Sequence, residues 1–114
     1  MIVYSDLRPG NFVKTDSTGK MKLLKLSLED LLSIKSGKLE VLPVLIAGKW
    51  LMRFGFSQNE TFAHFKLHPV YVICDNGGWY FVKRQIKINT HPLLYIHQLQ
   101  NLFYAMCGED LTIS

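Results

Sequence analysis

Cysteine and proline are scarce in this chain, with two and four residues among 114. The two cysteines, Cys74 and Cys107, are too few for the disulfide framework of a small secreted protein, and a reducing compartment keeps them as thiols. The longest apolar stretch, residues 39–52, is interrupted by charges and is shorter than the roughly 18 residues of a membrane-spanning helix. The first residues reach Asp6 before any long apolar run, which predicts no secretory signal. We therefore expect a cytoplasmic protein without membrane contact.

Motifs that carry chemistry are also missing. His64 and His68 are four residues apart in β-like sequence, where they would lie about 13 Å apart, too far to bind one metal ion. The chain has no zinc-binding spacing, nucleophile elbow, phosphate-binding glycine loop or dinucleotide fingerprint. Cys107 falls at the C-terminus of an expected helix, where the helix dipole disfavours a thiolate. The sequence thus predicts no metal, no cofactor and no enzymatic activity.

What the chain does have is the composition of an ordinary globular domain. Apolar residues make up 48% and charged residues 19%, far from the charge-rich composition of disordered chains. A length of 114 residues suits one domain, residues 1–114. The formal net charge of +4 and the pI near 9.1 modestly favour anionic partners.

Turn and cap residues mark the elements of the first half. The pair Pro9-Gly10 suits a type II turn, and a β-hairpin is expected after it, over residues 12–26. Ser27 and Gly37 bound a short helix. Pro43 makes residues 39–46 an edge strand or an extended connection, and a second short helix is expected over 48–54.

The second half changes to β-like alternation and then to a helix. Residues 61–88 read as a three-stranded meander whose last strand covers 79–88. A helix is expected from Pro92 to Cys107, ended by Gly108. The predicted fold is α+β: a bent antiparallel sheet of five or six strands, comprising the N-terminal hairpin and the meander, with the C-terminal helix packed on it and two short connecting helices.

The C-terminal helix has one face without any charged residue. This face carries His97, Gln98, Gln100, Asn101 and Tyr104, whereas a solvated helix surface normally carries charges. Two interpretations stay open. Either His97 and Asn101 satisfy backbone groups beneath a loop, or His97, Gln98, Asn101 and Tyr104 form the contact surface for a protein partner or a second copy of the chain.

One face of the last predicted strand combines aromatic and basic residues: Trp79, Phe81, Lys83 and Lys87 alternate there. Arg84, and Lys66 or His64 from a neighbouring strand, could add positive charge. Such a face can stack bases and hold phosphates, so it is a candidate nucleic-acid surface. In the alternative interpretation a helix covers Trp79 and Phe81, and only the lysines remain outside.

Residues 97–105 read HQLQNLFYA and are followed by GEDL at 108–111. This segment resembles the C-terminal signature HQLQNLYFALTGEEL of a family of small uncharacterised proteins of gut anaerobic bacteria and their phages and mobile elements. The family also resembles this chain around residues 6–11 and 44–56, where Ala47 and Gly48 replace a capping Thr-Glu pair. The family has no established activity, so the resemblance implies a bacterial cytoplasmic setting and no catalytic residues.

Taken together, these features favour a non-enzymatic accessory or adaptor protein that acts through protein contact by its C-terminal helix. The partner would be an unknown protein or a second copy of the chain. The second hypothesis is a nucleic-acid-binding module that uses the strand face from Trp79 to Lys87.

Overall fold

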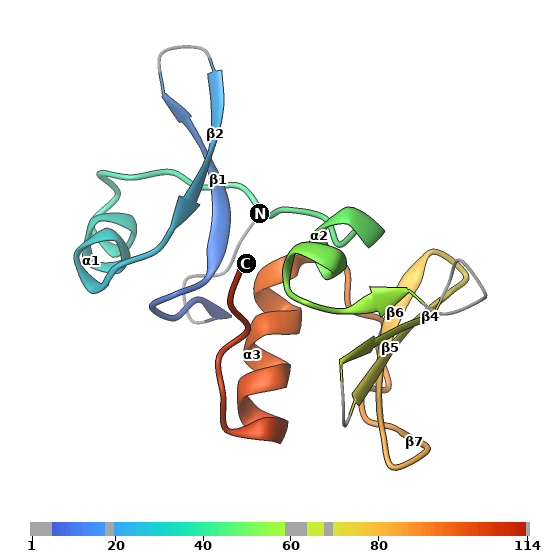
Figure 1. Cartoon of the computed structure of the whole chain (residues 1–114). Helices are drawn as coiled ribbons and strands as arrows, with labels where there is room; N and C mark the ends of the chain where they lie inside the picture. The colour runs from blue at the N-terminus through green and yellow to red at the C-terminus, as the bar shows by residue number, and fades with distance from the viewer. Residues whose placement is uncertain (1–5, 18–19, 59–63, 68–69, 114) are drawn as a thin grey trace. The chain divides into compact units, whose positions relative to one another are not determined.

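The fold belongs to the α+β class, as the sequence predicts. The computed structural model describes residues 6–17, 20–58, 64–67 and 70–113. The chain, expected as a single domain, is built from two compact units (Figure 1). Unit 1 comprises Met1–Leu45 and Tyr95–Asp110, and unit 2 comprises Ile46–Leu94 and Leu111–Ser114.

Unit 1 begins with the predicted hairpin. Strands β1 (Phe12–Ser17) and β2 (Lys20–Lys25) pair antiparallel and form a two-stranded sheet of their own, separate from the other strands. Gly10 has a φ of +94° in the turn before β1, and its N–H donates to the carbonyl of Leu26 at 2.8 Å. Only glycine adopts this conformation without a Cβ penalty, so the Pro-Gly pair closes the base of the hairpin.

Helix α1 (Leu28–Lys35) follows as predicted, with Ser27 as its N-cap. The Ser27 hydroxyl accepts the Asp30 N–H at 3.1 Å, and the Asp30 carboxylate accepts the Ser27 N–H at 2.9 Å. This capping box satisfies two of the N–H groups that a helix start leaves unpaired. Leu31 packs into a small core with Val13 of the hairpin.

The connection after α1 is extended, as Pro43 predicts. Leu42 forms an isolated antiparallel bridge with Lys14, and Leu45 forms another with Tyr95. The second bridge joins the connection to the residue that precedes helix α3.

Helix α3 (Ile96–Cys107) is shorter than predicted. The expected start at Pro92 is wrong, because the residues before Ile96 are extended and pair with other backbone segments. The expected end is confirmed, since Gly108 caps the helix with a φ of +73°. The hydrophobic pattern that predicts a helix from Pro92 does not reveal that Leu93 and Tyr95 form strand-like backbone pairs instead.

Unit 2 contains helix α2 (Gly48–Arg53), near the predicted position, and a five-stranded antiparallel sheet. The strands follow in sequence order: β3 (Ser57–Gln58), β4 (His64–Leu67), β5 (Val70–Asp75), β6 (Gly78–Lys83) and β7 (Ile86–Lys87). One face of this sheet is the core face: the side chains of Phe65, Val70, Val72 and Phe81 are at most 2% exposed. Gly48 of α2 lies directly against the Phe65 ring, where a Cβ would approach within 2.9 Å.

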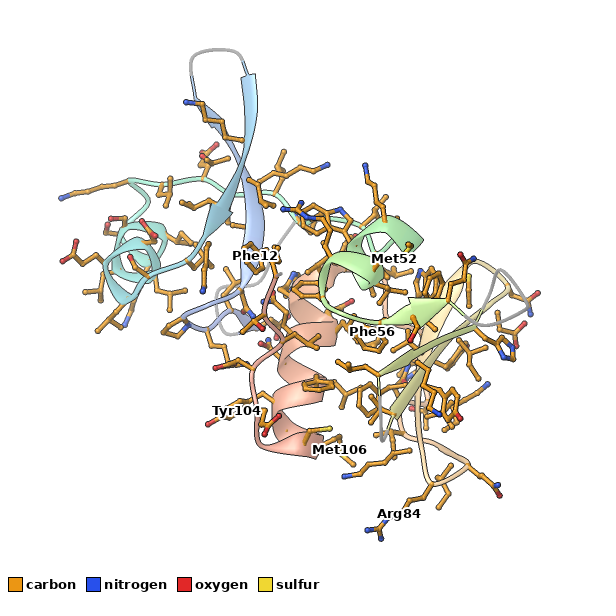
Figure 2. All side chains as sticks on the ribbon, viewed as in Figure 1. Phe12, Met52, Phe56, Arg84, Tyr104 and Met106 are labelled. Atoms are coloured by element: carbon orange, nitrogen blue, oxygen red, sulfur yellow. The ribbon has the colours of Figure 1, made fainter. Side chains whose placement is uncertain are left out.

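The single last strand predicted over 79–88 is wrong, because a tight turn divides it into β6 and β7. Arg84 and Gln85 occupy the turn with φ values of +54° and +64°, and Arg84 projects from its tip (Figure 2). Two-residue hairpin turns of this kind normally contain Asn or Gly, so the pair Arg-Gln hides the turn from sequence reasoning. Beyond the turn the chain runs back, and Val82 pairs with Lys87.

Candidate functional site

The second face of the five-stranded sheet carries a set of aromatic and basic side chains, none of which is buried. The strand register places one residue from each strand in a row, ordered Ser57, Lys66, Tyr71, Val82 and Lys87. A second row contains His64, Ile73 and Tyr80. We call these eight residues the open face, because residues paired across neighbouring strands project to the same side of a sheet.

Each tyrosine of the open face has a lysine above its ring. The Nζ of Lys87 lies 3.8 Å from the Tyr80 ring centroid, and the Nζ of Lys66 lies 5.5 Å from that of Tyr71. Both distances fall in the range of cation–π interactions. Because Tyr71 pairs with Val82 and Tyr80 with Ile73, the two tyrosines are diagonal neighbours on adjacent strands, with Cα atoms about 7–8 Å apart.

Positive charge is concentrated in the unit that holds this face. Unit 2 contains six Lys and Arg residues against two Asp and Glu, whereas unit 1 contains seven of each sign. The net charge of +4 therefore belongs to unit 2 alone. In the described strands of the five-stranded sheet, Asp75 is the one carboxylate, and it stands at the turn between β5 and β6. The open face is thus a basic surface with two half-buried tyrosine rings.

The four residues proposed from sequence as a nucleic-acid surface do not share a face. Phe81 is 0% exposed and belongs to the core face, so it is not available to a ligand, and the prediction is wrong for this residue. Trp79 is half-buried and packs its ring 5.8 Å from that of Phe65. Lys83 is half-buried on the same side as Phe81, while Lys87 is exposed on the open face. The turn between β6 and β7 explains the position of Lys87, because it reverses the alternation of the residues that follow it. Trp79, Phe81 and Lys83 precede the turn and stay on one side of β6.

The sequence prediction does not include Tyr71 and Tyr80. It places Lys66 and His64 beside Trp79 and Phe81, whereas the register places both on the opposite, open face. Alternation alone shows that a strand has two unlike faces, but it does not say which of them is the core. In the structure, Phe81 pairs with Val72 and is 0% exposed, which identifies the side of Phe81 as the core face and the side of Tyr80 as the open face.

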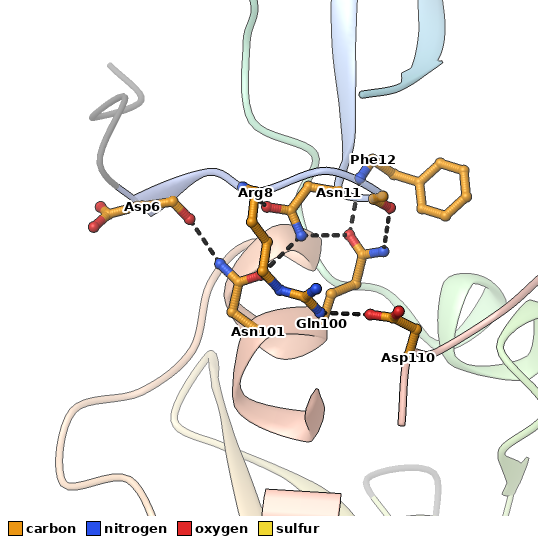
Figure 3. Close-up of polar contacts among 8 residues, drawn as sticks. Asp6, Arg8, Asn11, Phe12, Gln100, Asn101 and Asp110 are labelled. Carbon is orange, nitrogen blue, oxygen red and sulfur yellow. Dashed lines mark hydrogen bonds and ion pairs between the residues drawn. The ribbon is translucent and has the colours of Figure 1, made fainter. Parts of the chain in front are cut away.

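Polar side chains on the uncharged face of α3 form hydrogen bonds within unit 1. The Gln100 side chain accepts the Phe12 N–H at 2.8 Å and donates to the Gly10 carbonyl at 2.9 Å. Asn101 donates to the Asp6 carbonyl at 2.7 Å and accepts 2.9 Å bonds from the side chains of Asn11 and Arg8 (Figure 3). Of the two residues expected to satisfy backbone groups beneath a loop, Asn101 binds the Asp6 carbonyl, whereas the Nδ1 of His97 binds none within the described part of the chain.

Two other contact candidates on α3 are engaged as well. The side-chain Oε1 of Gln98 accepts the Tyr95 N–H at 3.0 Å, at the start of the helix. His97 is 3% exposed and stacks on the Tyr95 ring at 5.8 Å. Burial lowers the pKa of His97 from its ordinary value of 6.5, and the nearby Asp6 carboxylate partly offsets this effect. Among the described residues, the Nδ1 of His97 is a buried side-chain atom without a hydrogen bond.

Tyr104 is the exposed member of the four α3 candidates, with 46% of its surface accessible. The Arg8 guanidinium lies 4.3 Å from its ring centroid and forms a 2.7 Å ion pair with Asp110. A contact surface on α3 would therefore be restricted to the end of the helix that carries Tyr104.

Unit 2 also has a shallow groove of about 470 Å³ beside α2, lined by Lys49, Met52, Phe65, Cys74 and Trp79 among others. Its lining is mostly apolar, and its polar groups include the Lys49 amine, the Gln58 amide and the Cys74 thiol. No group of three or more potential metal ligands converges in the described residues. Within the same residues, every helix is too short or too polar to cross a membrane.

Comparisons with known proteins add no family to this geometry: no protein-family model, curated protein or solved structure matches the chain significantly. The site is therefore interpreted from its own residues.

Proposed function

We propose that this chain is a nucleic-acid-binding protein whose binding surface is the open face of the five-stranded sheet. The observation that supports this best is the pairing of Tyr71 with Lys66 and of Tyr80 with Lys87 on one accessible side of the sheet. Aromatic rings stack on bases and ammonium groups bind phosphates, so this combination suits a nucleic acid. The net charge of +4 on unit 2 supports the same choice, because it attracts polyanions.

Protein contact through α3 ranks second in this proposal. Three of its four candidate residues already bind within unit 1, and exposed Tyr104 is the feature that still favours it. We further propose a cytoplasmic location, where Cys74 and Cys107, both unpaired, remain thiols.

The proposal is tested by fluorescence anisotropy with a labelled single-stranded oligonucleotide at about 50 and 200 mM salt. We expect micromolar binding at the lower salt concentration that weakens steeply at the higher one, because released counterions drive phosphate binding. The variant Lys66→Glu/Lys87→Glu should lose at least tenfold in affinity.

A matched control is Lys35→Glu/Lys38→Glu in unit 1. Both lysines are exposed, and the substitution changes the net charge of the chain by the same amount. The control should bind within about twofold of the unaltered protein. Absence of binding at the lower salt concentration, or an equal loss in both variants, would contradict the proposal.

A further inference from the structure

We infer that the open face holds two nucleotide subsites for a single strand, one at Tyr71 with Lys66 and one at Tyr80 with Lys87. In each subsite a base stacks on the tyrosine ring and the adjacent phosphate binds the lysine. This inference rests on the proposed function and specifies its ligand as single-stranded, with two successive nucleotides as the minimal unit.

The rings and ammonium groups are already arranged in pairs without a ligand. Lys87 lies 3.8 Å from the Tyr80 centroid, so its ammonium occupies the ring face where a base would stack. Both lysines are exposed on flexible side chains. When a lysine turns from the ring toward the adjacent phosphate, it loses a cation–π interaction and gains an ionic one. The same rotation exposes the ring face on which the base stacks. Binding therefore needs rotation of side chains and no change of the sheet.

The strand register places the two subsites next to each other. Lys66 pairs directly with Tyr71 across β4 and β5, while Lys87 pairs with Val82, two residues from Tyr80. The two lysines stand on opposite sides of the tyrosines and are three strand spacings apart, about 14 Å. The tyrosines are diagonal neighbours between them, so a strand that crosses the sheet meets a cation, two rings and a second cation in that order.

This arrangement discriminates against a duplex. Within a duplex both faces of each base are stacked on neighbouring bases, so a tyrosine cannot reach them unless the helix opens. A single strand presents its base faces freely, and stacking tolerates any base because every base has a π-face. The row of subsites should therefore prefer single strands and show little sequence preference. Asp75, the one carboxylate in the described strands of this sheet, stands at the end of β5, beyond the row of lysines.

The experiment compares labelled single strands of two to eight nucleotides with a duplex of the same length, by anisotropy at about 50 mM salt. Base–aromatic stacking contributes roughly 5- to 150-fold in affinity per base. We therefore expect Tyr71→Ala/Tyr80→Ala to lose at least 25-fold for single strands. Tyr71→Phe/Tyr80→Phe, which keeps both rings, should stay within about twofold. Tyr104→Ala in unit 1 is the matched tyrosine control and should bind normally.

Two further readouts keep the inference testable if the alanine variant is unstable. Tyrosine ring protons of the unaltered protein should shift upfield in NMR spectra when a dinucleotide is added, which requires no variant. The salt dependence of log K should lose about 1.4 from its slope in Lys66→Gln/Lys87→Gln, because two phosphate contacts to a single strand contribute that amount.

The outcomes separate the two proposals. Equal affinity for duplex and single strand, with no effect of Tyr71→Ala/Tyr80→Ala and no ring-proton shift, overturns the two subsites but leaves electrostatic nucleic-acid binding intact. No binding of any oligonucleotide overturns both. A 25-fold loss restricted to single strands, restored by phenylalanine, supports both.

Discussion

The two units of this chain use polar side chains in opposite ways. In unit 1, the amides of Gln100 and Asn101 turn toward the backbone of the N-terminal segment, and positive and negative residues are equal in number. In unit 2, the core face of the sheet is apolar, whereas Tyr71 and Tyr80 lie on the accessible face with lysines above them. Polar groups that bind backbone partners stabilise a fold, while polar and aromatic groups that face solvent are available to a ligand.

This difference shows why residue type alone is a poor guide to function in this chain. The uncharged helix face looked like a contact surface because it lacked charges, yet most of its polar atoms have partners inside unit 1. The aromatic and basic surface was expected on Trp79, Phe81, Lys83 and Lys87, whereas the two tyrosines lie on the opposite side of the sheet. Hydrogen-bond partners and strand register distinguish the two surfaces.

The largest effect should come from the apolar side of the sheet in unit 2. Phe81→Ala should lower the free energy of unfolding by about 3–5 kcal/mol, because it removes a ring that is 0% exposed. Tyr80→Ala changes the adjacent residue on the other face and should cost about 1 kcal/mol or less. Urea unfolding followed by circular dichroism measures both. Similar losses of unfolding free energy in the two variants would contradict the distinction between a core face and an open face.

The next largest effect should come from the amide network of unit 1. Gln100→Ala leaves the Phe12 N–H and the Gly10 carbonyl without their partner. A buried backbone group left unpaired costs about 1–3 kcal/mol. The bond to Phe12 is buried and the bond to Gly10 is only partly buried, so we expect a total loss of about 2–4 kcal/mol in urea unfolding. Exposed Gln58 in unit 2 supplies the control, since Gln58→Ala should stay within about 0.5 kcal/mol.

Gln100→Ala also tests whether the roles of the units are separate. At a temperature where the variant is folded, its affinity for a single-stranded oligonucleotide should equal that of the unaltered protein. A parallel loss of affinity and stability would show that the amide network of unit 1 supports the open face, so the roles of the two units would not be separate.

Local signals were sufficient for much of the fold. The Ser27 cap predicted α1, Pro43 predicted an extended connection, and Gly108 predicted the end of α3. These features depend on residues close in sequence, whose capping and turn preferences are strong. The α+β class followed from them and from the β-like alternation of the second half.

The candidate site could not be predicted in the same way, because it depends on long-range pairing. A two-residue turn without Asn or Gly, at Arg84 and Gln85, moved Lys87 from the side of Phe81 to the side of Tyr80. Strand-like pairing of Leu93 with Trp79 delayed the start of α3. A shift of one position changes the face of every later residue, so the hidden turn put Lys87 on the other face. Trp79, Phe81 and Lys83 precede the turn, and they were assigned to the wrong side because alternation does not say which face of a strand is the core.

The smallest effect should be a pH dependence that belongs to unit 1. Burial lowers the pKa of His97 below 6.5, the value expected in the unfolded chain, although Asp6 opposes the shift. Because the unfolded state binds the proton more readily, stability should fall as the pH drops below about 6.5. Of these two effects, burial of the ring outweighs the Asp6 carboxylate, which favours the imidazolium.

Urea unfolding at pH 7.5 and 5.5 measures this contribution. The difference in unfolding free energy between the two pH values should be smaller in His97→Gln than in the unaltered protein, whereas His91→Gln, at an exposed position, should leave it unchanged. Comparing differences between pH values removes any cost of the substitution that is independent of pH. Equal pH dependence in both variants would show that His97 is not the source of the acid sensitivity.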